Sequence, residues 1–290
     1  MQNATVRMTG ETTRRMDTLY DQLIQLQRIP HAYVEWTAYR NALTDFVLAH
    51  TKEDQSVVII GAGECNDFDL CRMSDHFSQI LLLDHQEDAM RAGLKRQKID
   101  SARIRPVRAD LLGITDDTYR AMCDVLLFAL QRQLRGEAGP EVFERLFLEQ
   151  MHSAFSSRKP SDFLRQEAVV DYCICCGVHS QLINIFPQMA GIYKNYIHFN
   201  QDAICKAARS MNTVIAQELN ACLLRLSGTG VILGLEKCRL GMDGGIEGAV
   251  QGLLDIQSRN VTIAETMQLL WPFDRSQNKI YETELLYIQK

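Results

Sequence analysis

The feature that most constrains this chain is a short apolar run that stops at a pair of glycines. The run Val57-Val58-Ile59-Ile60 is apolar at every position and β-branched, and Gly61-Ala62-Gly63 follows it directly. Such a run is typical of a strand in a parallel sheet, where both faces are covered. Glycines after the strand permit a tight turn and let the backbone come close to a ligand. The run therefore predicts an α/β fold with a binding turn at the end of this strand.

A second short apolar run follows at residues 80–83, and residues 104–107 can form a short third strand. Residues 67–78 and 87–98 lie between these three segments and can form helices. Parallel strands cannot be joined by a tight hairpin and need a crossover connection of this kind. The order of these segments predicts three parallel strands connected by helices.

The rest of the chain continues the alternation of helices and strands, as judged from the spacing of its apolar residues. The predicted elements are amphipathic helices within 115–155, a strand at 168–176, a long helix at 202–226, a strand at 231–235, a helix at 246–256, and a terminal strand pair at 267–273 and 281–288. We expect a connecting loop at 274–278.

The residues before the first strand have a helical pattern instead. Apolar residues recur at helical spacing through residues 11–50, which predicts two or three helices. No internal repeat, low-complexity tract or linker rich in proline and glycine divides the chain. We therefore expect an N-terminal helical cap or lid at residues 1–52 and one α/β domain at residues 53–290, with a helical insertion at about 115–165.

The charge balance bears on the class of partner. The chain has 31 Lys and Arg against 36 Asp and Glu, which gives a formal net charge of -5. General binding of nucleic acid needs clustered positive charge. The densest basic run, formed by Arg103, Arg105 and Arg108, is short. The composition therefore predicts no bulk nucleic-acid partner.

Cysteine usage and the length of the apolar runs bear on the compartment. The nine cysteines have no regular spacing, unlike those of a secreted disulfide framework. Residues 1–10 contain no apolar signal core. The longest apolar runs, such as 125–130, fall far short of the roughly 18 residues that span a bilayer. We expect a cytoplasmic protein that does not enter a membrane.

Acidic residues follow the second and third predicted strands. Asp84 stands 21 residues after Gly63, and Asp110 comes just beyond the third strand. In nucleotide-binding α/β folds an acid at the position of Asp84 accepts hydrogen bonds from ribose hydroxyls. The carboxyl ends of parallel strands share one edge of the sheet, where open α/β sheets bind ligands. These residues predict a cofactor site at that edge.

On these residues and on the order of its strands, the chain resembles the class I S-adenosylmethionine-dependent methyltransferases over roughly residues 56–290. The resemblance implies a Rossmann-like, mostly parallel sheet with helices on both faces and a closing antiparallel hairpin, here within residues 267–288. It also implies S-adenosylmethionine as the cofactor and methyl transfer as the reaction.

The resemblance also implies cofactor-binding positions at four strand ends. The glycine turn would lie beside the methionine part of the cofactor, an acid would bind the ribose, the third strand end would meet the adenine, and the fourth would border the transferred methyl group. In that order these positions are Gly61, Ala62 and Gly63; Asp84; Asp110 with Leu111; and Cys176.

Two positions depart from the family pattern. The acid usual two positions before the first glycine is Ile59 here, and the usual third glycine is Cys65. The residue that would bind the amino group of the cofactor is therefore open. Glu64 or Asn66 could take that role, and the guanidinium of Arg40 could reach the cofactor carboxylate from the cap.

Two alternatives use the same residues. Gly61, Gly63 and Asp84 could hold a nicotinamide cofactor of an oxidoreductase, although the third glycine of that pattern would fall at Asn66 and a closing hairpin is not expected there. The chain could also bind a nucleotide-like ligand without turnover, or act as an interaction partner. We expect methyl transfer, with a small molecule as the preferred class of acceptor and a protein as the alternative; the identity of the acceptor and the oligomeric state are not readable from the sequence.

His179 is the candidate general base, because it comes three residues after the predicted end of the fourth strand. A hydrogen-bonded structural role is the alternative. Cys173, Cys175 and Cys176 lie near His179, but alternation along a strand points Cys175 and Cys176 to opposite faces. No second Cys/His cluster completes a tetrahedral site, so we expect no metal.

Aromatic residues occur in two places that could border an acceptor. Tyr33, Trp36 and Tyr39 lie in the predicted cap, and Trp271 and Phe273 end the first strand of the terminal pair. Each group could line an acceptor pocket. Packing between the cap and the domain, and core packing at a strand end, are the preferred interpretations.

Overall fold

The computed structural model describes residues 20, 23, 29–100 and 102–290, so the helices predicted within residues 11–28 lie almost entirely outside the described residues. The chain forms two compact units. Residues 114–158 and 185–208, with the described residues before Ile29, belong to the first unit. Residues 29–113, 159–184 and 209–290 form the second unit, which contains the sheet.

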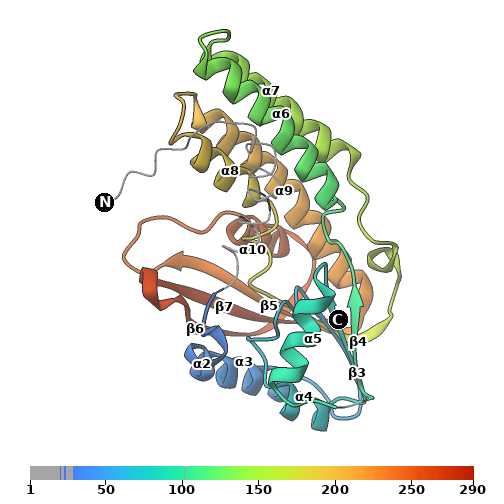
Figure 1. The fold of residues 1–290 in the computed structure, drawn as a ribbon. Helices are drawn as coiled ribbons and strands as arrows, with labels where there is room; N and C mark the ends of the chain where they lie inside the picture. The colour runs from blue at the N-terminus through green and yellow to red at the C-terminus, as the bar shows by residue number, and fades with distance from the viewer. Residues whose placement is uncertain (1–19, 21–22, 24–28, 101) are drawn as a thin grey trace. The chain divides into compact units, whose positions relative to one another are not determined.

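The second unit is built on a seven-stranded sheet with the strand order β3-β2-β1-β4-β5-β7-β6. The first five strands are parallel, and β7 pairs antiparallel with both β5 and β6. The strands are β1 (Ser56–Ile60), β2 (Gln79–Asp84), β3 (Ile104–Arg108), β4 (Val170–Cys176), β5 (Ser227–Arg239), β6 (Thr262–Asp274) and β7 (Lys279–Gln289). The predicted fold class is confirmed: the sheet is Rossmann-like and mostly parallel, with helices on both faces and a closing antiparallel hairpin (Figure 1).

The continuous apolar runs form strands because both faces of the sheet are covered. Val57 and Ile59 of β1 belong to one buried cluster, and Val58 and Ile60 belong to another on the opposite face. Both clusters extend across the sheet from β2 to β7. Burial of both faces explains why these runs lack the alternation of polar and apolar residues that a half-exposed strand shows.

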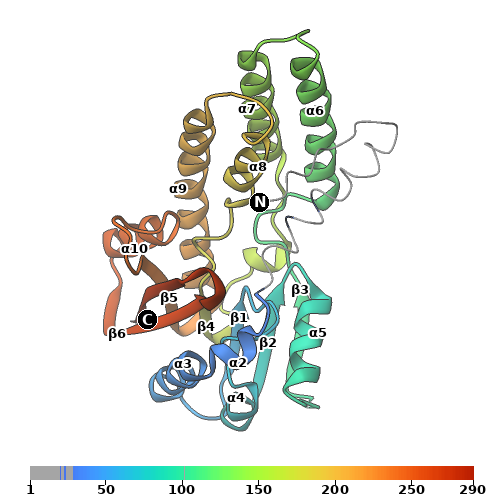
Figure 2. The ribbon, with the colours of Figure 1, turned by 60° about the vertical axis from the view of Figure 1, so that its left-hand side comes forward.

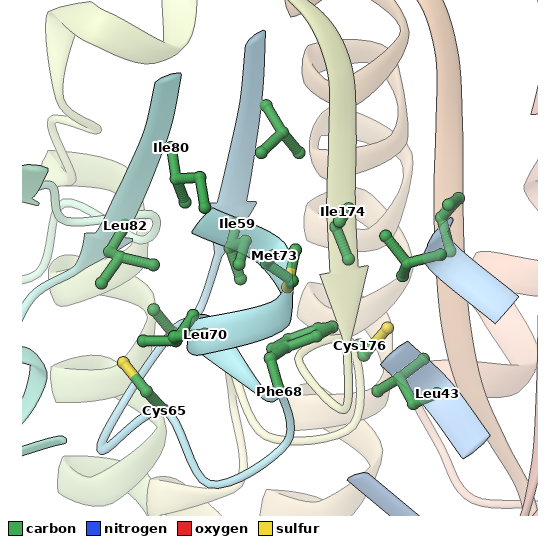
Figure 3. Packing of buried hydrophobic residues seen from close by; sticks show 14 of the residues in the cluster. Leu43, Ile59, Cys65, Phe68, Leu70, Met73, Ile80, Leu82, Ile174 and Cys176 are labelled. Carbon is green, nitrogen blue, oxygen red and sulfur yellow. The ribbon is translucent and has the colours of Figure 1, made fainter. Parts of the chain in front are cut away.

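Helices cover each face. One face packs against α2 (Ala32–Glu35), α3 (Thr37–His50), α4 (Leu70–His76) and Met90 of α5 (Glu87–Arg96). The opposite face packs against α10 (Ala249–Ser258) and the second half of α9 (Gln201–Leu226). Figure 3 shows part of the first face, where Leu70 and Met73 of α4 lie over Ile59 and Ile174 of the sheet.

The first unit is helical. It contains α6 (Asp116–Leu134), α7 (Pro140–Ser157), α8 (Ile185–Tyr193) and residues 201–208 of α9. The helices α6 and α7 lie side by side (Figure 2), and aromatic rings such as Phe143 and Tyr193, 5.2 Å apart, fill its interior. The helices predicted within residues 115–155 are confirmed. The division at residue 52 and the role of residues 1–52 as a lid stay predictions.

Three elements differ from expectation. The strands predicted at residues 231–235 and 267–273 are longer, because β5 pairs with β7 from Gly230 as far as Arg239 and β6 pairs with β7 from Thr262 as far as Asp274. The helix α8 was not predicted, and it follows the loop after β4. None of the described helices is long and apolar enough to cross a membrane.

Candidate functional site

The turn after β1 has the left-handed backbone that its glycines permit. Gly61 has φ 73° and Gly63 has φ 48°. A Cβ atom on Gly61 would lie 2.3 Å from Val178 Cγ2, whereas a Cβ on Gly63 would have no atom within 4 Å. The turn is therefore fixed on one side by Val178 and open on the other, so that a ligand can approach the backbone of Gly63.

Asp84, at the end of β2, is joined directly to this turn. Its Oδ2 accepts a hydrogen bond from the N–H of Gly63 at 2.9 Å, and its Oδ1 accepts one from the N–H of Gln86 at 2.9 Å. Burial alone would raise the pKa of Asp84, but His85, 3.1 Å away, and the two N–H groups outweigh burial and lower the pKa. Asp84 is thus a carboxylate at neutral pH, and its two oxygens have capacity for further hydrogen bonds.

Asp110 shapes the turn that follows β3. Its Oδ1 accepts hydrogen bonds from the N–H groups of Leu112 and Gly113 at 2.9 and 2.7 Å. Leu111 is partly buried against the core cluster on the face of the sheet that packs against α9 and α10. The N–H of Ala109 donates to the carbonyl of Asp84 at 2.9 Å, so the ends of β2 and β3 are held together. The structure therefore brings the predicted cofactor-binding positions around Asp84 and Asp110 to one edge of the sheet.

The residues considered for the amino and carboxylate groups of the cofactor bind other protein groups. Glu64 forms an ion pair with Arg96, and Asn66 Oδ1 accepts a hydrogen bond from the same guanidinium at 2.5 Å. Arg40 Nη1 donates to the carbonyls of Tyr33 and Asn66 at 2.6 and 3.2 Å. These contacts hold the loop after β1 in place, and the assignment of a partner for the cofactor amino group stays open.

Cys65 has the left-handed backbone conformation that a glycine would adopt readily at this position. Its φ is 55°, which lies in the left-handed region. Its side chain is buried beside Leu70 (Figure 3), and burial raises the pKa of its thiol to about 12. The departure from the family pattern thus leaves the turn intact and adds an uncharged core side chain.

The cysteines of β4 are core residues. Cys173 and Cys175 belong to the buried cluster of one face and Cys176 to that of the other, as alternation predicts. Burial raises the pKa of all three thiols. In the described part of the chain, no three His, Cys, Asp or Glu side chains gather as a metal site. Cys176 lies at the carboxyl end of β4, as its predicted position next to the transferred methyl group requires.

His179 lies buried, 1% exposed, in a polar group formed with α9 and α10. Asn220 Nδ2 donates to the carbonyl of Gly252 and to Asp255 Oδ2, both at 2.9 Å, so Asn220 Oδ1 is the acceptor for His179 Nε2 at 2.8 Å. Burial lowers the pKa of His179 to about 4. A general base must reach the proton that it removes. This geometry favours the structural role that the sequence also allowed, and we assign His179 no catalytic role.

A group of polar atoms without protein partners lies next to the ends of β4 and β5. Glu236 of β5 is 2% exposed, and its Oε1 accepts a hydrogen bond from Ser180 Oγ at 2.6 Å. Its Oε2 has no hydrogen-bond partner in the described structure. Thr283 of β7 pairs with Glu236 in the sheet register, and its hydroxyl is also buried and unpartnered. Burial raises the pKa of Glu236.

Aromatic side chains cover these polar atoms. Tyr39 stacks on Trp271 with ring centroids 5.6 Å apart, and Trp36 meets Trp271 edge-on at 5.0 Å. The Tyr39 hydroxyl and the Trp271 indole N–H have no partner among the described residues. Packing of Trp36, Tyr39 and Trp271 between α3 and the sheet is confirmed. We call Tyr39, Asp67, Glu236, Trp271 and Thr283 the Glu236 cluster.

Asp67, in the loop after β1, completes the cluster. Burial raises its pKa to about 7, the negative charge of Glu236 adds to the rise, and Arg40 opposes the shift. Neither Asp67 nor Glu236 was predicted as a site residue. The available signal was a glutamate directly after the apolar run 231–235, because alternation places it on the same face as Ile232.

Replacing Asp67 by asparagine is expected to change how stability depends on pH. The folded pKa of about 7 lies above the ordinary value of 3.8, so the folded chain binds more protons between these values and loses stability as pH rises. An amide at this position does not titrate and removes this loss. We therefore expect the free energy of unfolding of D67N to rise by about 2 kcal/mol relative to that of the parent between pH 4 and pH 8. This figure is smaller than the full pKa shift would give, because solvent screens part of the charge of a partly buried group.

Urea denaturation at the two pH values measures this difference. Asp75→Asn, on the exposed surface of α4, is the matched control and should leave the pH dependence unchanged. An equal stability difference between D67N and the parent at both pH values would contradict the prediction.

Comparison with known proteins gives similarity at the level of solved structures. No protein-family model matches this chain, and no curated protein does. Among solved structures, a SAM dependent methyltransferase from Aquifex aeolicus is 10% identical, with 93% of this chain and 97% of that chain covered and a TM-score of 0.44. A putative RNA methyltransferase from Pyrococcus horikoshii is 9% identical, with 96% and 98% covered and a TM-score of 0.46.

Magnesium protoporphyrin IX methyltransferase from Synechocystis PCC 6803, solved with bound SAM, is 9% identical, with 100% of each chain covered and a TM-score of 0.44. At 10% identity or less, none of these three likenesses assigns an activity to this chain.

Proposed function

We propose that this chain uses S-adenosylmethionine to methylate a small-molecule acceptor at the carboxyl edge of its sheet. The observation that carries the proposal is the hydrogen bond from the N–H of Gly63 to the carboxylate of Asp84, in a turn where no atom would lie within 4 Å of a Cβ on Gly63. This hydrogen bond links the turn after β1 to the end of β2 in a sheet with the strand order β3-β2-β1-β4-β5-β7-β6. A glycine turn and an acid at neighbouring strand ends are the arrangement that binds a ribose-containing cofactor in such folds.

The residues present fit this cofactor. The open side of Gly63 leaves its backbone accessible, and the low pKa of Asp84 keeps the carboxylate ready to accept hydrogen bonds from hydroxyl groups. Leu111 offers a partly buried apolar surface for a base. We therefore assign the cofactor to Gly61, Ala62, Gly63, Asp84, Asp110, Leu111 and Cys176, as the sequence predicted.

The bound cofactor would supply a methyl group that its positively charged sulfur makes electrophilic. The protein would then have to orient an acceptor and exclude water. Gly177 follows Cys176, and the Glu236 carboxylate and the Trp271 ring lie beside Gly177. Their polar atoms are buried, which supports an acceptor small enough to enter the protein rather than one that stays on its surface.

Replacing Asp84 by alanine is expected to weaken binding of S-adenosylmethionine and of its product S-adenosylhomocysteine. Hydrogen bonds to a charged group contribute about 1.5–3 kcal/mol, so the dissociation constants should rise by about ten- to a hundredfold. Calorimetry with the parent and D84A proteins measures this change, and NAD is titrated in parallel.

Asp75→Ala is the matched control, because Asp75 is exposed on α4 and should not affect binding. Asp84→Asn, which keeps the side-chain shape, guards against loss of the turn that Asp84 anchors. Binding of NAD alone would favour an oxidoreductase. Absence of binding of both methyl-donor compounds to the folded parent protein would sink the methyltransferase proposal.

A further inference from the structure

We propose that the Glu236 cluster binds the positively charged amino group of a small substrate. This inference rests on the proposed function, because it names the class of acceptor that the methyl-transfer site would take. The cluster brings together a buried carboxylate, an indole, a phenol and a hydroxyl, and each of these four groups has one polar atom without a partner in the described structure.

The state of Glu236 is the first argument. Moving a carboxylate out of water is costly unless a cation or several donors compensate it. Glu236 forms no ion pair with any described Lys or Arg, and only Ser180 donates to it from a side chain. Its Oε2 is left free. A ligand with a positive charge and N–H groups would supply what this carboxylate lacks.

Outside the cluster, the described residues of the same unit also include buried polar atoms without a partner, namely Gln55 Oε1, His179 Nδ1, Arg225 Nε, Ser227 Oγ and Arg239 Nε, whereas other buried polar side chains are satisfied. Asn220 is completely buried, and its side chain binds His179, the carbonyl of Gly252 and Asp255. By contrast, four members of the Glu236 cluster each have an unpartnered polar atom and are at most 3% exposed: Tyr39, Glu236, Trp271 and Thr283. The concentration of unpartnered atoms in one place indicates a ligand rather than a packing defect.

The geometry places these groups on one face of the sheet. Glu236 pairs with Thr283, and Tyr281, two residues before Thr283, pairs with Trp271. Strand alternation therefore directs all four side chains to the same side. From that side, Tyr39 of α3 stacks on Trp271. A Cβ atom on Gly177 would lie 2.8 Å from the Trp271 ring and 3.8 Å from Glu236 Oε1, so both groups border the end of β4.

The aromatic rings favour the same class of ligand. Ammonium groups are attracted to the faces of tryptophan and tyrosine rings, most strongly where water is excluded. The free Trp271 N–H and the Tyr39 and Thr283 hydroxyls add donors for an oxygen atom elsewhere in the ligand. The cluster thus fits an amine that also bears a hydroxyl or carbonyl oxygen, and it fits a neutral apolar molecule poorly.

The two tryptophans of the chain, Trp36 and Trp271, both lie at this place, so intrinsic fluorescence reports its occupation. The test uses a W36F protein, in which Trp271 is the only fluorophore of this type. It is titrated at pH 7 with methyl-, propyl- and benzylammonium chloride and with the corresponding alcohols. We expect a saturable change with at least one ammonium ion and none with its matched alcohol.

The variant that tests the carboxylate is Glu236→Gln in the same background, which keeps the side-chain shape. Loss of a charge-assisted contact should weaken ammonium binding about tenfold or more. Glu284→Gln is the matched control, because Glu284 lies next to Thr283 on β7 but on the opposite face, and it should leave binding unchanged. Circular dichroism establishes that each variant is folded.

Equal responses to ammonium ions and alcohols, no response to any probe, or an E236Q protein that binds as tightly as its parent would each overturn the amine site. Because the fluorescence titration uses no cofactor, its result does not depend on the methyl-donor experiment. Binding of S-adenosylhomocysteine without any charge-selective response would leave the proposed function intact and refute the amine class alone.

Discussion

Replacing Gly61 by alanine is expected to lower the free energy of unfolding of the sheet-containing unit by about 3 kcal/mol. Two costs combine at this position. The backbone φ of 73° disfavours any residue with a side chain, and the new Cβ would lie 2.3 Å from Val178 Cγ2. The turn cannot move freely, because the N–H groups of Gly61 and Ala62 both donate to the carbonyl of Leu83. Urea denaturation followed by tryptophan fluorescence measures the loss.

A second substitution separates the two costs. Val178→Ala removes the methyl group that the new Cβ would strike, and alone it should cost about 1 kcal/mol of buried apolar contact. In the double variant we expect a coupling of at least about 1 kcal/mol in favour of the pair. Simple additivity of the two single variants would show that the clash with Val178 is not what requires glycine at this turn.

The second large effect concerns His179. Its folded pKa of about 4 lies below the ordinary value of 6.5, so the unfolded chain binds more protons between these values. Stability is therefore full above pH 6.5 and is lost as pH falls toward 4. The shift corresponds to about 3 kcal/mol. His179→Gln keeps a side-chain donor for Asn220 Oδ1 and should remove this part of the acid sensitivity.

Urea denaturation of the parent and H179Q proteins at pH 7 and pH 4.5 measures the change, since other titrating groups cancel in the difference. His152→Gln, on the exposed surface of α7, is the control and should leave the pH dependence as it is. A parent protein that loses no more stability on acidification than H179Q would contradict the burial of a neutral imidazole.

The sheet could be predicted from the sequence because its strands carry their own signal. A run that is apolar at every position, such as 57–60, can only be satisfied where both faces are covered. The spacing of Asp84 from Gly63 likewise follows from one strand, one helix and the next strand, and the two residues meet through a hydrogen bond. Signals of this kind lie in residues that are close in the sequence, so they can be recognised without knowing which distant segments pack together.

The Glu236 cluster could not be predicted, because its residues come together only in the folded chain. Tyr39, Asp67 and Trp271 are distant in the sequence, and only the pairing of β5 with β7 and the packing of α3 bring them to Glu236. His179 shows the converse. Its position after β4 suggested a reactive group, but the fold turns the ring toward Asn220 and away from water.

The strand order also bears on how the chain is made. The ribosome produces β6 before β7, yet β7 lies between β5 and β6 in the finished sheet. Until residues 279–289 emerge, β6 has no neighbour to pair with, and the long edge of β5 is exposed to other nascent chains. Loss of the β7 segment by premature termination would therefore remove two strands from the sheet at once and leave an edge prone to aggregation.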